Sequence, residues 1–147
     1  MPHKAAAEAR KDTEMQVLIT GSREWSAVQK PLMLEKVREI LSWCNNENHE
    51  VIVGDAYGVD EFVRRHCETL GLVCRVFGAY GKYRNPDIGG IHAMCDFPSY
   101  PSRDLKMAQQ CNMCVAVWNK TSRGTKIAYE AARRLGKRVI VRTFEGN

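Results

Sequence analysis

Long apolar segments are missing from this sequence, and so are the usual marks of export. No run reaches the roughly 18 to 20 apolar residues that a membrane-spanning helix requires. The first ten residues, MPHKAAAEAR, lack the apolar core of a secretory signal. We therefore expect a soluble, cytoplasmic protein that does not bind membranes.

The sequence also gives little indication of disulfides or of a metal site. The six cysteines belong to a chain of 147 residues, which can bury a core without covalent cross-links, so free thiols are expected. The spacing His92-x-x-Cys95 followed by Cys111-x-x-Cys114 is compatible with zinc. However, Cys111 is expected to end a helix and Cys114 to begin a buried strand, so their thiols need not converge. Neither a metal nor a cofactor is expected.

The sequence does contain enough apolar material for one folded domain. It is 44% hydrophobic and 27% charged, which excludes disorder throughout. Residues 1–14 lack apolar periodicity and are expected to form a mobile tail, which leaves residues 15–147 as a single domain. Residues 119–147 hold eight Lys and Arg and two Glu, a net +6, against −1 for residues 1–118. Such a basic region attracts the phosphates of nucleotides or nucleic acids.

Short apolar runs alternate with segments of helical periodicity. Strands are expected at 15–20, 51–53, 73–77, 113–118 and 138–143, and helices at 31–43, 59–70, 102–110 and 125–135. Continuous apolar runs are typical of parallel strands that are buried on both faces. The pattern therefore predicts an α/β fold with a doubly wound parallel sheet of five strands.

Residues 79–101 interrupt this alternation. Connections in α/β units usually have about 2 to 6 residues, and this one is far longer. It carries glycines and prolines together with Ile88, Ile91, Met94 and Phe97. These apolar groups need a partner surface, so we expect a lid or an oligomer contact and a homo-oligomeric protein. The alternative is a plain surface excursion.

Three loops follow the first, second and fourth expected strands, and a parallel sheet brings such loops to one edge. They are 20–25 (TGSREW), 54–60 (GDAYGVD) and 119–125 (NKTSRGT). Glycine lets a backbone approach a ligand closely, the N–H groups of a helix start attract anions, and Arg23 and Arg123 can bind phosphate. Trp25 offers a face on which a base could stack. Neither GxGxxG nor GxxxxGK[ST] is present.

Each of these residues also has a purely structural interpretation. Gly21 and Gly58 fit turns, while Asp60 and Ser122 fit helix caps. The convergence of three such loops on one edge nevertheless favours a phosphate-bearing ligand.

The order of these motifs resembles the SLOG superfamily, which includes the DprA/Smf and LOG proteins. The resemblance rests on 19–25 (ITGSREW), 54–60, 102–104 (SRD) and 115–125, and covers residues 15–141. It implies a Rossmann-like sheet in the order 3-2-1-4-5, with a ligand pocket between the ends of the first and fourth strands. Together, the loops and the resemblance assign ligand contacts to Gly21, Ser22, Arg23, Trp25, Gly54, Ala56, Gly58, Asp60, Arg103, Asn119, Ser122, Arg123, Gly124 and Thr125.

The resemblance implies binding of a nucleotide or a nucleotide-derived ligand by a sensor, carrier or sequestering protein. One alternative is a hydrolase that cleaves an N-glycosidic or phosphoester bond. LOG hydrolases carry PGGxGTxxE, but Ala128 occupies the place of the catalytic Glu, so activity would require another carboxylate such as Asp55 or Glu130. The other alternative is DprA-like binding of single-stranded nucleic acid through basic residues and the aromatics Tyr80, Tyr83 and Tyr100.

Overall fold

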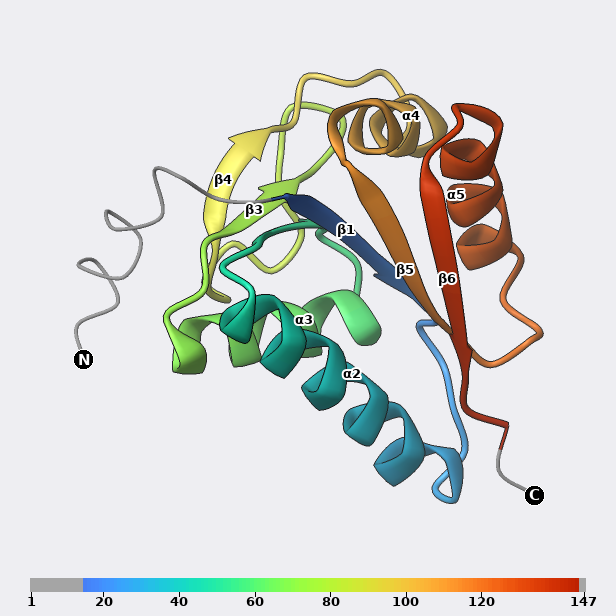
Figure 1. Ribbon diagram of the computed structural model, residues 1–147. Coiled ribbons are helices and arrows are strands. Elements are labelled where there is room, and N and C mark those ends of the chain that lie inside the picture. The colour runs from blue at the N-terminus through green and yellow to red at the C-terminus, as the bar shows by residue number, and fades with distance from the viewer. Residues whose placement is uncertain (1–14, 146–147) are drawn as a thin grey trace.

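The computed structural model of the protein describes residues 15–145, in which helices cover both faces of a parallel sheet (Figure 1). The strands are β1 (Gln16–Gly21), β2 (Glu50–Gly54), β3 (Cys74–Phe77), β4 (Ile91–Met94), β5 (Met113–Trp118) and β6 (Arg138–Thr143). The helices are α2 (Gln29–Asn46), α3 (Val59–Leu70), α4 (Tyr100–Gln110) and α5 (Arg123–Arg134). The expected α/β class is confirmed. None of the described helices has both the length and the apolar character needed to cross a membrane.

The expectation of five strands was wrong by one. The sheet has six, in the order β4-β3-β2-β1-β5-β6, and the five expected strands keep the order 3-2-1-4-5 within it. The sixth, β4, lies inside the segment 79–101 and pairs in parallel with β3 at the sheet edge. Its four residues are all exposed, so it has no buried apolar run from which a strand could be predicted.

Alternate residues of the central strands face two separate apolar layers. Val17 and Ile19 of β1 pack in the layer beneath α2 and α3, whereas Leu18 packs in the layer beneath α4 and α5. Figure 1 shows these two helix pairs on opposite sides of the sheet. Burial on both faces explains why these strands are continuous apolar runs in the sequence.

Five of the six cysteines serve as packing residues in these layers. All six are free thiols, and only Cys95 is partly exposed. Burial raises the pKa of the Cys114 thiol to about 12 and also raises the pKa of Cys111, which removes the thiolate needed for reactivity. Among the described residues, no group of three or more His, Cys, Asp or Glu side chains could hold a metal ion.

A completely buried arginine fixes the turn between β3 and β4. The guanidinium of Arg64, on α3, donates hydrogen bonds to the carbonyl groups of four residues at 2.9 to 3.3 Å. Those residues are Arg84, Asn85, Ile88 and Gly89. Burial lowers the pKa of Arg64, yet arginine stays protonated in proteins. One side chain on α3 therefore holds a stretch of the 79–101 segment in place.

We expect Arg64→Met to lower the free energy of unfolding by at least about 3 kcal/mol, because four carbonyl groups lose their donor. Urea unfolding measures the loss. The neighbouring Arg65 is the matched control, since its side chain is 58% exposed and forms an ion pair with Glu61 on the same helix; Arg65→Met should change the stability by less than about 1 kcal/mol. Equal losses in the two variants would contradict the anchoring role of Arg64.

Candidate functional site

A cavity of about 520 Å³ opens at the carboxyl ends of β1, β2 and β5. Its wall comes from the loops that follow these strands, from the first turns of α4 and α5, and from the segment 79–101. Protein pockets that hold small molecules have roughly 300 to 1,000 Å³. The cavity is therefore large enough for a small organic ligand.

The structure brings most of the residues expected to contact a ligand together around this cavity. Those that line it are Gly21, Arg23, Gly54, Ala56, Asp60, Arg103, Asn119, Ser122, Arg123, Gly124 and Thr125. The other lining residues, which were not among the expected contacts, are Thr20, Glu24, Arg84, Tyr100, Asp104, Met107, Thr121 and Ala128. The three loops do converge, as the order of strands in a parallel sheet requires.

Trp25 and Gly58, which were also expected at the site, do not line the cavity. Trp25 packs against Phe62, with the ring centroids 5.9 Å apart, at the edge of the core. Gly58 has a φ of 88°, and a Cβ at this position would lie 2.5 Å from Cα of Arg23. Both residues therefore support the conformation of the loops without lining the cavity.

Ser22 and Asn119 join the first loop to the last. Ser22 is completely buried, and its Oγ accepts a hydrogen bond from the backbone N–H of Asn119 at 3.0 Å. The Asn119 side chain accepts from the N–H groups of Thr121 and Ser122, both at 2.9 Å, and donates to the carbonyl of Glu24 at 3.1 Å. These bonds hold the chain ahead of α5 in a fixed position, and Ser22 contributes from outside the cavity lining.

The N-terminus of α5 opens on one wall of the cavity. Ser122 caps the helix, since its Oγ accepts from the N–H of Thr125 at 3.4 Å. Helix geometry leaves the N–H groups of Arg123 and Gly124 without an intrahelical acceptor. A Cβ on Gly124 would have no heavy atom within 4 Å, so the space in front of this turn is open. Such a turn favours an anion through its free N–H groups and its dipole.

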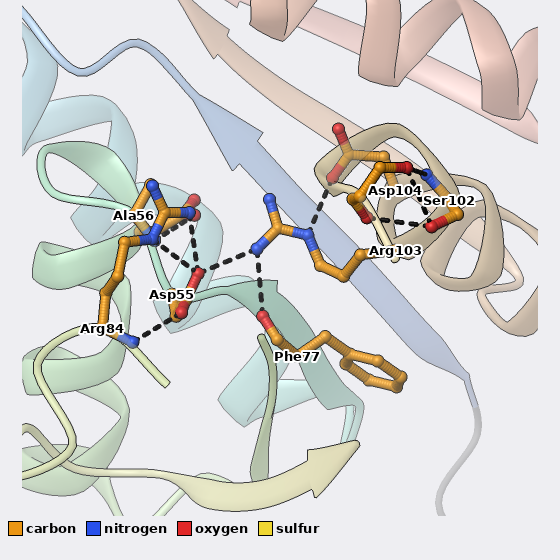
Figure 2. Close-up of polar contacts among 9 residues, drawn as sticks. Asp55, Ala56, Phe77, Arg84, Ser102, Arg103 and Asp104 are labelled. Carbon is orange, nitrogen blue, oxygen red and sulfur yellow. Dashed lines mark hydrogen bonds and ion pairs between the residues drawn. The ribbon is translucent and has the colours of Figure 1, made fainter. Parts of the chain in front are cut away.

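On the opposite wall, a buried carboxylate joins two arginines (Figure 2). Oδ1 of Asp55 accepts hydrogen bonds from Arg84 at 2.7 Å and from Arg103 at 2.9 Å, and Oδ2 accepts from the backbone N–H of Arg84 at 2.6 Å. Arg103 also donates to the carbonyl of Phe77 at 3.0 Å and to Asp104 at 2.9 Å. Burial by itself would raise the pKa of Asp55, but the bonds and charges of the two arginines outweigh it and lower the pKa.

These contacts bear on the two carboxylates considered as catalytic groups. Asp55 is completely buried behind its arginines and does not line the cavity. Glu130 points elsewhere on α5, 3.9 Å from Arg134, and does not line the cavity either. Ala128, which the resemblance to LOG proteins places at their catalytic glutamate, does line it.

Asp60 is the buried carboxyl group that faces the cavity. It is 7% exposed, and its Oδ2 accepts a hydrogen bond from the N–H of Ala56 at 3.2 Å. A Cβ on Gly54 would lie 2.8 Å from that oxygen and 2.9 Å from Nη1 of Arg103. Gly54 therefore leaves the room that the two side chains need above the end of β2.

The surroundings of Asp60 favour its neutral form. Burial raises its pKa to about 7; the charge of Arg103 and the hydrogen bond from Ala56 offset this only in part, while the carboxylates of Asp104 and Asp55 add to the rise. The connection after β2 thus carries a carboxyl group that stays ionised, Asp55, and the first turn of α3 carries one that titrates near neutral pH, Asp60.

Arg84 and Tyr100 are the cavity residues for which the sequence offered least guidance. Both come from the segment 79–101, and the guanidinium of Arg84 lies 4.1 Å from the centroid of the Tyr100 ring, with that of Arg103 at 4.9 Å. The unusual length of the segment was the available signal. It singled out the segment without indicating which of its side chains reach the cavity.

The fold and the position of the cavity are those of a doubly wound α/β protein. Strand order reverses between β1 and β5, and the cavity lies at this switch point, where ligands bind in doubly wound α/β proteins. No protein-family profile and no curated protein matches the chain.

Solved structures do match it. One is TM1055, a structural genomics target, with a TM-score of 0.62, 20% identity, and coverage of 84% of this chain and 71% of that one. Another is DNA processing protein A from Helicobacter pylori, described by its single-stranded DNA binding mode. It has a TM-score of 0.61 and 16% identity, and the match covers 90% of this chain and 67% of that one. A third is the molybdenum cofactor carrier protein from Chlamydomonas reinhardtii. It has a TM-score of 0.63 and 16% identity, and the match covers 86% of this chain and 74% of that one. At the level of the fold, these likenesses confirm the Rossmann-like architecture that the sequence predicted.

The raised pKa of Asp60 predicts a pH-dependent effect of Asp60→Asn on stability. The folded protein holds a proton on Asp60 up to about pH 7, whereas the unfolded chain releases it near pH 4. The wild type should therefore lose up to about 1.4 kcal/mol of stability per pH unit between pH 4 and 7 through this group, and no more above pH 7. Asp60→Asn lacks this loss. The free energy of unfolding of the variant minus that of the wild type should therefore increase from pH 5 to 7 and then level off. Urea unfolding at several pH values measures it, and a difference that does not change with pH would contradict the assignment.

Proposed function

We propose that the protein binds a nucleotide or a nucleotide-derived phosphorylated ligand in this cavity, as a sensor, carrier or sequestering protein. The observation that carries the proposal is the open N-terminus of α5, where Gly124 leaves free space in front of unpaired N–H groups. Arg23 and Arg123 are exposed and line the same cavity, so they can add charge-assisted bonds to a phosphate.

Two structural neighbours support a binding role. One is described by its mode of binding single-stranded DNA, and the other is a carrier of the molybdenum cofactor. Both descriptions concern binding of a ligand rather than its conversion. At 16% identity they support the general kind of function and leave the ligand to be identified from the cavity itself.

The hydrolase alternative finds less support in the cavity. The carboxyl side chains that line it in the described chain are those of Glu24, Asp60 and Asp104. Asp104 is paired with Arg103, and α5 presents Ala128 where the LOG enzymes present a glutamate. A hydrolase of that type needs a carboxylate beside the developing positive charge on the ribose, so we favour binding without turnover.

The single-stranded nucleic-acid alternative depends on free aromatic faces, and these rings already have partners. Tyr80 packs edge-on against Tyr100, with centroids 5.4 Å apart, and is itself 58% exposed, while the guanidinium of Arg84 lies over the Tyr100 ring at 4.1 Å. Tyr83 is stacked on His92 at 4.1 Å. Stacking platforms for successive bases are exposed rings. Tyr80 is exposed, whereas Tyr83 and Tyr100 are only partly exposed, so a small ligand in the cavity is the better supported partner.

Gly124→Ala tests the proposed phosphate position. The new Cβ meets no protein atom, so alanine should stabilise α5, by up to about 1 kcal/mol, while it fills the space for the phosphate. We expect the affinity for AMP and for ribose 5-phosphate, measured by titration calorimetry, to fall about ten-fold or more. Gly136→Ala is the matched control at the other end of α5: its φ of 77° makes alanine destabilising, and binding should be unchanged. Undiminished binding by Gly124→Ala would remove the phosphate from this turn.

We further expect no release of free base when the protein is incubated with purine or pyrimidine nucleoside monophosphates. The missing glutamate at Ala128 typically corresponds to a loss of about 10² to 10⁴ in rate. Chromatography of the reaction mixture measures the base. Release of more base than protein present would overturn this expectation, and its loss in Asp60→Asn or Glu24→Gln would assign the activity to a carboxyl group of the cavity.

A further inference from the structure

We propose that Asp60 is a second recognition point of the cavity and accepts hydrogen bonds from the hydroxyl groups of a sugar whose phosphate lies at the N-terminus of α5. The inference rests on the proposed function and names the rest of the ligand: a phosphorylated sugar, either free or as part of a nucleotide. The N-terminal turn of α5 and Asp60 would then bind chemically different ends of one molecule.

The contacts of Asp60 leave acceptor capacity directed at the cavity. The side chain is 7% exposed and lines the cavity, and within the described chain it receives a hydrogen bond from Ala56 on Oδ2. An ionised carboxyl group has about four acceptor positions. A buried polar group with so few partners is costly unless another donor completes it, and the open side of Asp60 is the cavity.

The spacing of the strands that lead to the two recognition points sets the scale of the ligand. Asp60 follows β2, α5 follows β5, and both strands pair with β1. The ends of β2 and β5 are therefore two strand spacings apart, about 10 Å. A single phosphate group is too small to contact both walls, whereas a phosphate with an attached sugar reaches from one to the other.

The charges around Asp60 favour neutral donors over a second anion. Two of the nearby arginines already share Asp55, and Arg103 is also paired with Asp104. The charged groups that act on Asp60 from its own helix, from the β2 loop, from the 79–101 segment and from α4 are Arg64, Asp55, Arg84, Arg103 and Asp104. Because the carboxylates compensate these arginines, the wall beside Asp60 suits hydroxyl groups, which donate without bringing charge.

Asp60→Asn tests the inference with two probes, ribose 5-phosphate and inorganic phosphate. The asparagine oxygen can still accept from Ala56, so the loop should keep its shape, while the second acceptor becomes an amide donor. At pH 8 we expect the affinity for ribose 5-phosphate to fall about ten-fold to a hundred-fold and the affinity for inorganic phosphate to stay within two-fold (roughly the uncertainty of comparing two variants). Glu61→Gln, in the same turn of α3 and paired with Arg65, is the matched control and should change neither affinity.

A second pH separates a ligand contact from a structural effect. Since the pKa of Asp60 is about 7, the wild-type side chain is largely neutral at pH 5.5 and resembles asparagine, so the two proteins should bind ribose 5-phosphate alike there. An equal loss for both probes, no loss for either, or a difference that persists unchanged at pH 5.5 would overturn the role of Asp60. If Gly124→Ala weakens both probes but Asp60→Asn does not distinguish them, the proposed function stands and this inference fails. If the wild type binds AMP but neither probe, this inference alone fails; if it binds AMP no better than the probes, both fail.

Discussion

The cavity depends on one buried carboxylate, Asp55, which joins parts of the chain that are far apart in sequence. It accepts hydrogen bonds from Arg84 in the 79–101 segment and from Arg103 on α4. A buried anion is stable only when it is paired and hydrogen-bonded, so the two arginines cannot move away from Asp55 without a large loss. The long segment is therefore held against the sheet edge, and Tyr100 beneath the two guanidinium groups is held with it.

This arrangement also divides the cavity into two electrostatic regions. Near α5, the exposed Arg23 and Arg123 accompany the free N–H groups of the helix turn, which produces a positive wall. Near α3 and α4, the arginines are already paired with Asp55 and Asp104. Four arginines line the cavity, but only two of them have charge that is available to an anion. A count of basic residues would therefore overstate how many phosphates the cavity can hold.

Local patterns in the sequence predicted the features that local chemistry determines. Continuous apolar runs located five strands because those strands are buried on both faces, and the glycine, hydroxyl and arginine content of three loops located the cavity. The exposed strand β4 and the position of Arg84 in the cavity wall depend on contacts that form only in the folded protein. The strand depends on pairing with β3, and the loop that carries Arg84 depends on the hydrogen bonds that Arg64 donates to its carbonyl groups. Neither leaves a periodicity or a spacing that could be recognised in one sequence.

Asp55 and Asp60 show most clearly why residue roles could not be assigned from the sequence. They lie five residues apart and have the same side chain. Asp55 has a lowered pKa because two arginines bind it, whereas Asp60 has a pKa of about 7 because burial outweighs the hydrogen bond from Ala56 and the charge of Arg103. The ionised form of Asp60 therefore opposes folding above neutral pH. A ligand that donates hydroxyl groups to it would offset that cost, so ligand binding and folding stability are coupled most strongly where Asp60 is charged.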